Sequence, residues 1–347
     1  MATEISDRTL ESDAPAFTAE VADATAAIYE RLRPVTPEME WPVHAPYIYA
    51  INRLKVERKA VVLAHNYQTP EIFHGVADLT GDSLALAREA ANTKAEVIVL
   101  CGVHFMAETA KVLNPAKTVL IPDLQAGCSL ASSITADDVR RLRERHPGAP
   151  VVTYVNTSAE VKAESDVCCT SANAVEIVNA LNARRVIFLP DEFLGRHVAA
   201  HTDVEIILWN GHCEVHERFT AEDLRSYRNL YDDLVILAHP ECPPDVLAEA
   251  DFIGSTAGMI RRVAEWQPGR AMLVTECSMS DNVSVEFPRI EFIRPCNLCP
   301  HMKRITLPKI LRTLETMTYE VTVPHSIAER ARQAVQRMLD LTPRRAR

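Results

Sequence analysis

Glycine is scarce in this sequence, and glycine-rich loops are absent from it. The chain has 347 residues, of which 10 are glycine, about 3% where proteins on average have about 7%. No two glycines stand in the G-x-G spacing of a dinucleotide-binding turn, and there is no G-x-x-x-x-G-K phosphate loop. These absences argue against the common kinds of nucleotide-driven chemistry.

Long apolar runs and an excess of positive charge are also missing. The longest apolar run covers residues 97–103, which is far short of the roughly 18 residues that indicate a membrane span and fits a buried strand. Asp and Glu number 47 against 37 Lys and Arg, a net charge of -10, whereas a nucleic-acid-binding protein carries a basic footprint. We therefore expect neither a membrane nor a nucleic acid as a partner.

The N-terminus lacks the basic and apolar regions of a signal peptide. Residues 1–17 carry Glu4, Asp7, Glu11 and Asp13, and we expect a flexible acidic tail on a cytoplasmic protein. Nine cysteines, an odd number without an export signal, argue against a disulfide framework. Nine thiols in a reducing compartment point to metal binding or catalysis, although free cysteine is also a common core residue.

From about residue 60 onward, short β-rich apolar runs alternate with helical stretches. Helical spacing also marks residues 18–33, and residues 323–341 have the pattern of an amphipathic helix. Continuous apolar strands separated by helical segments indicate parallel sheets that are covered on both faces. The sequence thus predicts an α/β fold. The expected strands are 60–64, 97–101, 118–121, 151–155, 186–189, 205–209, 234–238, 252–254, 271–275 and 290–293.

The strands repeat with a long period, which indicates homologous units. Three of them begin near residues 61, 151 and 234, and each leads into a polar side chain: His65, Asn156 and His239. Each unit later reaches a cysteine, at intervals of 85 and 86 residues: Cys128, Cys213 and Cys299. We predict three pseudo-symmetric αβα units with short parallel sheets around a central cavity. They cover residues 41–140, with the helix 323–341 packing back onto them, 141–228 and 229–310, after an N-terminal extension over 1–40.

Each of the three strands is also followed by a short turn that carries hydroxyl groups. These turns are Asp82-Ser83, Thr170-Ser171 and Ser255-Thr256. Such residues most often cap a helix N-terminus. Capping is compatible with anion binding, because a helix N-terminus offers free N–H groups to a phosphate or carboxylate.

Three cysteines at this spacing favour one kind of metal site. Ligands of an open parallel sheet gather beyond the carboxyl ends of the strands, so three thiolates would meet in the cavity. The long separation does not resemble a zinc ribbon, whose ligand pairs are local, and suits an iron–sulfur cluster. A 4Fe-4S cluster with three cysteine ligands leaves one iron open as a Lewis acid, which predicts a dehydration reaction.

Other roles for these residues stay open at this point. The pair Cys296-x-x-Cys299 is also typical of a redox dithiol or half of a zinc site, and His65 and His239 have the alternative of being core histidines. The remaining cysteines lack a phased partner, and we expect them to be buried thiols: Cys101, Cys168, Cys169, Cys242 and Cys277.

Seven segments, in order between about residues 60 and 310, resemble the quinolinate synthase family. Any one of them is weak evidence, but seven in order are highly specific. The segments are Ala64-His65-Asn66-Tyr67-Gln68, Ala126-Gly127-Cys128-Ser129-Leu130-Ala131, Tyr154-Val155-Asn156-Thr157-Ser158-Ala159, Cys169-Thr170-Ser171-Ala172-Asn173-Ala174, Gly211-His212-Cys213-Glu214-Val215-His216, Ala238-His239-Pro240-Glu241-Cys242 and Cys299-Pro300-His301-Met302-Lys303.

The resemblance implies a central 4Fe-4S cluster bound by one cysteine from each unit, which matches Cys128, Cys213 and Cys299. It implies an enzyme of de novo NAD biosynthesis that condenses iminoaspartate with dihydroxyacetone phosphate, losing phosphate and two waters to form quinolinate. Iminoaspartate would come from an aspartate-oxidising enzyme. The implied substrate-binding residues are His65, Ser83, Tyr154, Asn156, Ser171, His216, His239, Glu241, Ser255 and Thr256, and Tyr67 lines the same pocket.

The resemblance also implies roles for the pocket residues. Tyr154, His239, Glu241 and Tyr67 are the expected catalytic residues, since imine formation, phosphate loss and dehydration each move a proton. The serines and Thr256 would hold the carboxylates and phosphate of the substrates. His216 would orient the cluster or the substrate, and Glu276 is a weaker candidate for the same pocket. Where some family members have C-x-x-C-x-x-C this chain has only the last pair, and we hypothesise that Cys296 pairs reversibly with Cys299.

Two other functions remain as alternatives. One is a regulator that senses redox state or metal through the three thiols, although the net charge of -10 argues against DNA binding. The other is a cluster-dependent hydro-lyase of hydroxy acids. The turns suited to phosphate favour a phosphorylated substrate over that one.

Overall fold

The computed structural model describes residues 14–342. Most of the acidic tail expected over residues 1–17 lies outside this range. The first helix, α1 (Ala19–Leu32), forms where the helical spacing predicts one, and the Thr18 side chain caps it by accepting a hydrogen bond from the N–H of Val21. The next helix, α2 (Trp41–Glu57), packs against α1 and against α15 (Leu307–Thr316).

The described residues form three sheets of four parallel strands, all with the same strand order. In each sheet the first strand of the unit lies second, in the orders β2-β1-β3-β4, β6-β5-β7-β8 and β10-β9-β11-β12. The predicted α/β fold of three similar units is therefore confirmed. The strands are β1 (Ala60–His65), β2 (Leu79–Gly81), β3 (Val97–Cys101), β4 (Thr118–Leu120), β5 (Val151–Tyr154), β6 (Val167–Cys169), β7 (Arg185–Leu189), β8 (Glu205–Leu208), β9 (Leu234–Ala238), β10 (Phe252–Ile253), β11 (Arg270–Val274) and β12 (Glu291–Ile293).

Sequence analysis missed two strands, β2 and β6. Each has only three residues, Leu-Thr-Gly in β2 and Val-Cys-Cys in β6, and neither contains the run of β-branched or aromatic residues that indicates a strand. They are edge strands, and each pairs with the first strand of its unit, β1 or β5. Their position is therefore decided by pairing with a partner rather than by their own sequence.

Helices follow the strands along the chain and cover the sheets. The remaining α-helices are α3 (Pro70–Phe73), α4 (Ser83–Asn92), α5 (His104–Leu113), α6 (Ser129–Ser132), α7 (Ala136–Arg145), α8 (Ala159–Ala163), α9 (Ala174–Ala180), α10 (Glu192–Ala199), α11 (Ala221–Leu230), α12 (Pro244–Ala248), α13 (Thr256–Trp266), α14 (Ser278–Glu286) and α16 (His325–Leu341). Two short 3₁₀ helices are η2 (His216–Arg218) and η3 (Met302–Arg304). Within residues 14–342, no helix combines the length and apolar character that a membrane span requires.

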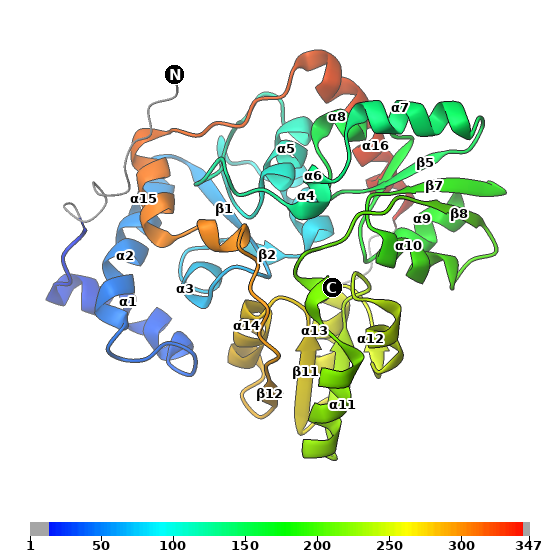
Figure 1. Ribbon diagram of the computed structural model, residues 1–347. Helices are drawn as coiled ribbons and strands as arrows, with labels where there is room; N and C mark the ends of the chain where they lie inside the picture. Colours follow the sequence, from blue (N-terminus) through cyan, green and yellow to red (C-terminus); the bar gives the residue numbers. More distant parts are fainter. Residues whose placement is uncertain (1–13, 343–347) are drawn as a thin grey trace.

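Figure 1 shows the three units around the middle of the molecule, the first in blue and cyan, the second in green and the third in yellow at the bottom. All five residues of β3 are buried, as a strand covered on both faces should be. The last helix, α16, contacts α8, β6 and α9 of the second unit and α5 of the first. It therefore joins two units, and its buried face includes Ala331, Val335 and Met338.

The pseudo-symmetry extends to one repeated aspartate. In each unit an aspartate just before the second strand accepts a hydrogen bond from an N–H of the first strand, at 2.8, 2.7 and 2.8 Å. The same aspartate donates its own N–H to the carbonyl of that strand residue. The pairs are Asp78 with Val62, Asp166 with Val151 and Asp251 with Ile236.

A basic side chain completes each of these contacts. The basic side chain forms an ion pair with the aspartate, at 2.8, 2.8 and 2.9 Å in the three units. It also donates a hydrogen bond to the backbone carbonyl of the residue two positions before that aspartate. The basic residues are Lys55, Arg143 and Arg228. Because this contact fixes where the second strand begins, it sets the register of the two strands whose ends face the cavity.

Replacing Asp166 with Ala tests the repeated contact. The variant leaves the Val151 N–H and the Arg143 guanidinium without their carboxylate, and we expect a loss of about 1–3 kcal/mol in the free energy of unfolding. Urea denaturation measures it. The matched control is Asp137→Ala, whose side chain is 68% exposed in its pair with Arg140 and should change stability by less than about 0.5 kcal/mol. Equal shifts for the two variants would contradict the structural role.

Candidate active site

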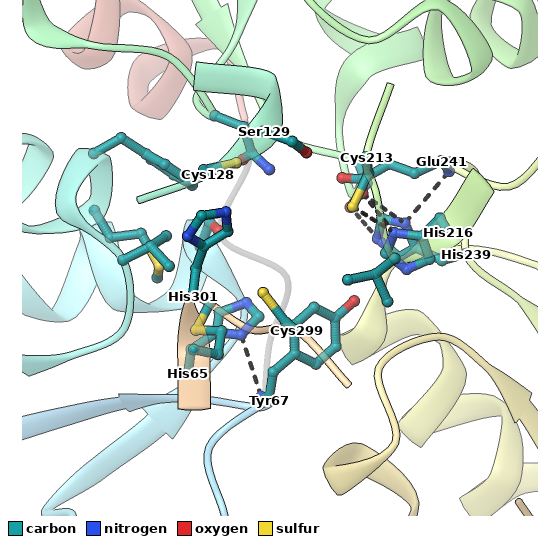
Figure 2. Close-up of a pocket in the computed structure, with 18 of the residues that line it drawn as sticks. His65, Tyr67, Cys128, Ser129, Cys213, His216, His239, Glu241, Cys299 and His301 are labelled. Atoms are coloured by element: carbon teal, nitrogen blue, oxygen red, sulfur yellow. Dashed lines mark hydrogen bonds and ion pairs between the residues drawn. The ribbon is translucent and has the colours of Figure 1, made fainter. Parts of the chain in front are cut away.

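One cavity collects residues from the strand ends of all three sheets. The site residues predicted from the sequence line it with two exceptions, Ser255 and the weaker candidate Glu276. Figure 2 labels ten of the lining residues and shows how they face one another. The side chain of Ser255 is buried and caps α13 by accepting the N–H of Gly258 at 3.2 Å. The convergence follows from the fold, since parallel strands of a sheet end at the same edge.

Cys128, Cys213 and Cys299 all line this cavity as free thiols. Each follows the fourth strand of its own sheet and precedes a short helix: α6, η2 or η3. Their spacing of about 85 residues is thus the length of one unit. Burial raises the pKa of Cys128 to about 12 and also raises the pKa of Cys213 and Cys299. Their thiols therefore hold their protons unless a metal ion displaces them.

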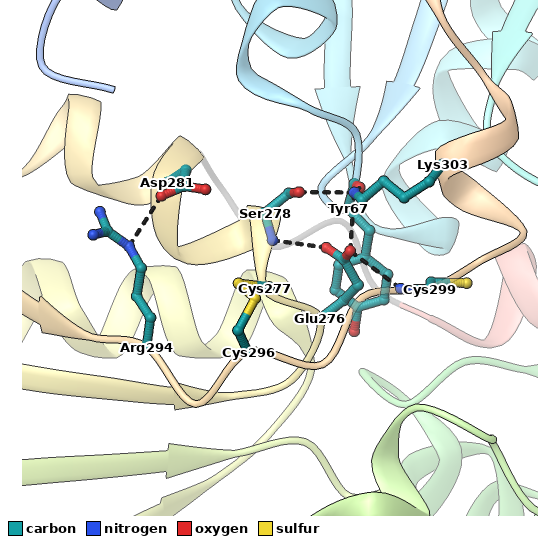
Figure 3. Close-up of a disulfide and its surroundings, with 9 residues drawn as sticks. All are labelled: Tyr67, Glu276, Cys277, Ser278, Asp281, Arg294, Cys296, Cys299 and Lys303. Atoms are coloured by element: carbon teal, nitrogen blue, oxygen red, sulfur yellow. Dashed lines mark hydrogen bonds and ion pairs between the residues drawn. A yellow bond between two sulfur atoms is a disulfide. The ribbon is translucent and has the colours of Figure 1, made fainter. Parts of the chain in front are cut away.

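Four other cysteines are buried free thiols, as predicted: Cys101, Cys168, Cys169 and Cys242. The prediction for Cys277 is wrong, because Cys277 forms a disulfide with Cys296 (Figure 3). The proposed pairing of Cys296 with Cys299 is also wrong. The tertiary structure explains both errors. The end of β11 lies beside the loop after β12, where the Cys277 N–H donates a hydrogen bond to the Asn297 carbonyl. Cys299 instead faces the cavity.

Glu241 is the centre of a hydrogen-bonded chain across the cavity. One carboxylate oxygen accepts the hydroxyl of Tyr154 at 2.5 Å, and the other lies 2.7 Å from Nδ1 of His216. On its far side the His216 ring contacts the Thr275 hydroxyl at 2.9 Å, and that hydroxyl lies 2.6 Å from the hydroxyl of Tyr67. A continuous path therefore links two tyrosines from two different units through a carboxylate and an imidazole.

Burial controls the charges of this group. It raises the pKa of Tyr154 and Tyr67 well above the usual value, and the negative charge of Glu241 raises both further. It lowers the pKa of His239 to about 3 and that of His65 to about 4. Burial would also raise the pKa of Glu241, but the electrostatic attraction of the His216 and His239 rings and the hydrogen bonds with His216 and Tyr154 outweigh it and lower that pKa. Near neutral pH the cavity therefore holds an ionised Glu241 beside protonated tyrosines and neutral imidazoles at His65 and His239.

His239 stacks on His216, with ring centroids 4.7 Å apart. Its Nε2 lies 3.1 Å from the hydroxyl of Ser171, whereas its Nδ1 is 3.9 Å from Glu241, too far for a hydrogen bond. The Ser171 hydroxyl comes from the second unit and His239 from the third. This contact joins a hydroxyl turn to a strand end across the boundary between the units.

The hydroxyl turns point helix N-termini at the cavity. Ser83 and Thr256 are the first residues of α4 and α13 and both line it. The side-chain amide oxygen Oδ1 of Asn156 is buried and has no hydrogen-bond partner within the described part of the chain. No lysine or arginine is among the lining residues that the structure describes. Any anion in this cavity would have to be held by helix N-termini, hydroxyls and amides.

Sequence analysis missed several lining residues that adjoin the three cavity cysteines: Ser129, Glu214 and His301. The Ser129 hydroxyl donates to the His212 carbonyl and accepts the Glu214 N–H, so it brackets Cys213. The imidazole of His301 lies 2.9 Å from the Glu214 carboxylate. The sequence signal that could have identified them is their position beside the three cysteines, in the same segments that resemble the family. Thr275, also missed, follows β11 as His239 follows β9.

One group of potential ligands is tight enough for a single metal ion. Ligand atoms of Cys213, His216 and Glu241 lie within 4.8 Å of one another. Hydrogen bonding already accounts for this closeness, because Nδ1 of His216 contacts both the Cys213 sulfur, at 3.2 Å, and the Glu241 carboxylate. The group includes only one of the three cavity cysteines.

Comparison with known proteins supplies the family. The family model of quinolinate synthetase A protein matches residues 49–340. Quinolinate synthase 2 of Mesorhizobium japonicum is 65% identical over 92% of this chain and 98% of its own. The quinolinate synthases of Sinorhizobium medicae and Xylella fastidiosa are 59% and 64% identical over 94% and 84% of this chain, and 91% and 86% of theirs. The chain belongs to the quinolinate synthase family of enzymes.

Proposed function

We propose that the protein makes quinolinate for NAD biosynthesis by condensing iminoaspartate with dihydroxyacetone phosphate, releasing phosphate and water. The observation that carries this proposal is the meeting of three free cysteines, one after the fourth strand of each sheet, in a cavity that also holds the Tyr154–Glu241–His216 chain. Relatives of 59–65% identity that bear the name quinolinate synthase support it. Iminoaspartate would be supplied by an enzyme that oxidises aspartate, and the reaction would take place in the cytoplasm.

The donor set of the cavity fits a 4Fe-4S cluster held by Cys128, Cys213 and Cys299. Cysteine thiolate is the usual ligand of such clusters, and all three cysteines are free to bind. No fourth cysteine lines the cavity in the part of the chain that the structure describes, so one iron of such a cluster would have no protein thiolate. When bound, the cluster would supply a Lewis acid that polarises a carbonyl or hydroxyl oxygen of the substrate.

The protein side chains would move the protons of the reaction. Tyr154 and Tyr67 keep their protons at neutral pH because burial raises their pKa, so both can donate to a substrate oxygen. Glu241 is ionised and can take a proton back through Tyr154, to which it is hydrogen-bonded. The neutral imidazole of His239 can accept a proton from carbon or nitrogen. Holding donors and acceptors together in one cavity suits a sequence of condensation and dehydration steps.

The substrates are anions, and the cavity would hold them without basic side chains. The N-termini of α4 and α13 point N–H groups at the cavity, and Ser83, Ser171 and Thr256 add hydroxyls. Such groups bind carboxylates and phosphates. The unpartnered Asn156 amide can bind a substrate donor such as an imine N–H. A binding surface without lysine or arginine also leaves a released phosphate free to depart, which a basic side chain would oppose.

A zinc site at Cys213, His216 and Glu241 is the competing function, since their ligand atoms are close enough for one ion. It would leave Cys128 and Cys299 without a role. Zinc sites with three protein ligands of this kind are catalytic rather than structural, so metal analysis separates the two proposals.

Anaerobic purification with analysis of iron, sulfide and zinc tests the cluster. We expect about four irons and four sulfides per chain, lost in air. Cys128→Ala should abolish cluster assembly, because it removes one of three ligands, while the control Cys168→Ala changes a thiol that is fully buried in the core and should keep full iron. One zinc per chain without sulfide, persisting after anaerobic reconstitution, would refute the cluster.

Glu241→Gln tests the proton path. The variant keeps the shape of the side chain but removes the charge that accepts the Tyr154 hydroxyl, and we expect kcat for quinolinate formation to fall by about 100-fold or more with iron content unchanged. Tyr154→Phe should cause a similar loss, and the double variant should lose little more, because groups that act as a unit are not additive. Fully multiplicative losses would show that the two residues act separately. Glu217→Gln, on the exposed part of η2, is the control.

A further inference from the structure

A partly buried ion pair outside the cavity ties two of its functional groups together. Figure 3 shows Lys303 of η3 facing Glu276, which follows β11. The Lys303 ammonium lies 2.9 Å from a Glu276 oxygen, and the Glu276 side chain is 0% exposed. Neither residue lines the cavity. The pair is therefore separate from the groups that would contact substrate.

Every donor of the Lys303 ammonium has a partner. Besides Glu276, it donates to the backbone carbonyl of Tyr67 at 2.6 Å and to the hydroxyl of Ser278 at 2.7 Å. An ammonium has three N–H donors, so none remains for another contact. Tyr67 follows β1 of the first unit, and its hydroxyl is one end of the chain through Thr275 and His216. Lys303 thus fixes the backbone from which Tyr67 reaches into the cavity.

Glu276 holds the third cysteine in the same way. The oxygen that faces Lys303 also accepts the backbone N–H of Cys299 at 3.3 Å, and its other oxygen accepts the N–H of Ser278 at 2.9 Å. The Cys299 sulfur lines the cavity, so the carboxylate positions the backbone of that proposed ligand. One ion pair consequently spans the first and third units, with Tyr67 at one end and Cys299 at the other.

We propose that Lys303 and Glu276 are positioning residues that set the Cys299 thiol and the Tyr67 hydroxyl in one cavity at the correct separation. The proposal rests on the proposed function, in which Cys299 binds the cluster and Tyr67 moves a proton. A buried ion pair adds little net stability compared with apolar residues of similar size, so its contribution here is geometry. The disulfide Cys277–Cys296 and the hydrogen bond from the Cys277 N–H to the Asn297 carbonyl also hold these two segments together.

The test compares three variants with a matched control in the full-length, cluster-loaded protein. Lys303→Met removes the ammonium and keeps the length of the chain, Glu276→Leu removes the carboxylate, and the double variant removes both. The control is Lys309→Met, because Lys309 forms an ion pair of the same 2.9 Å length with Asp123 and does not line the cavity. Thermal midpoints identify any variant that is merely unstable.

The first measurement is the rate at which an iron chelator removes iron under anaerobic conditions. We expect Glu276→Leu and the double variant to lose iron at least about fivefold faster than Lys309→Met, because Cys299 is no longer held. Glu276→Gln, which keeps the acceptor oxygen, should restore most of the retention. Lys303→Met should lower kcat with little change in KM, because Tyr67 moves while the anion-binding turns stay. Rates of iron loss and kcat equal to those of Lys309→Met in all variants would overturn the proposal.

The double variant separates geometry from charge balance. If the pair served only to neutralise two buried charges, removing both would restore iron retention and kcat to the level of the control, and the positioning role would be refuted. If the ion pair positions Cys299 and Tyr67, the double variant will still lose iron faster than the control and have a lower kcat. Recovery or continued loss therefore decides between the two roles.

A thiol-labelling measurement keeps this result independent of the proposed function. Peptide mass spectrometry after maleimide treatment of the cluster-free protein gives the labelling of Cys299 relative to Cys213 in the same chain. We expect that ratio to rise in Glu276→Leu and to stay at the wild-type value in Lys309→Met. An unchanged ratio would refute the positioning role. A wild-type protein without iron or sulfide would refute the cluster instead, whatever the ratio shows.

Discussion

The carboxyl ends of parallel strands lie at one edge of a sheet, and here three such edges face the same cavity. The strand order is identical in the three sheets, so each unit contributes its groups at corresponding places: a polar residue after the first strand and a cysteine after the fourth. The repeated contact of Asp78, Asp166 and Asp251 with the first strand fixes the register on which this depends. The assembly of the site is thus a property of the backbone before it is a property of any one side chain.

Burial then determines the chemistry of the side chains. In water Tyr154 and His239 would titrate independently, but in the cavity the tyrosine keeps its proton and the imidazole loses its own. Glu241 keeps its charge because it has partners on both oxygens. A buried charge is tolerated only with such partners. The result is an ionised Glu241 beside a protonated tyrosine and a neutral imidazole, which is suited to moving protons while helix N-termini hold anions.

Hydrogen bonds and ion pairs from neighbouring residues hold the segments that carry the three cysteines. Ser129 and the contact between His301 and Glu214 link the cysteine segments to one another on the cavity side. Glu276, paired with Lys303, accepts the backbone N–H of Cys299 outside the cavity and so holds the third cysteine segment. Groups that bind a metal cluster need support from their surroundings to hold their ligand atoms in place. The proposed positioning pair belongs to that support, which is invisible to any search for the ligands themselves.

The sequence by itself determined the α/β fold, the three repeats and the candidates that line the cavity, because apolar runs, turn residues and periodic cysteines are local patterns. It did not determine the partners of those residues. Cys296 pairs with Cys277 rather than with Cys299, and Thr275 joins His216 to Tyr67. Both contacts depend on how chain segments 19 to more than 200 residues apart are brought together. Spacing along the chain carries no information about such distances; only the packing of the sheets decides them.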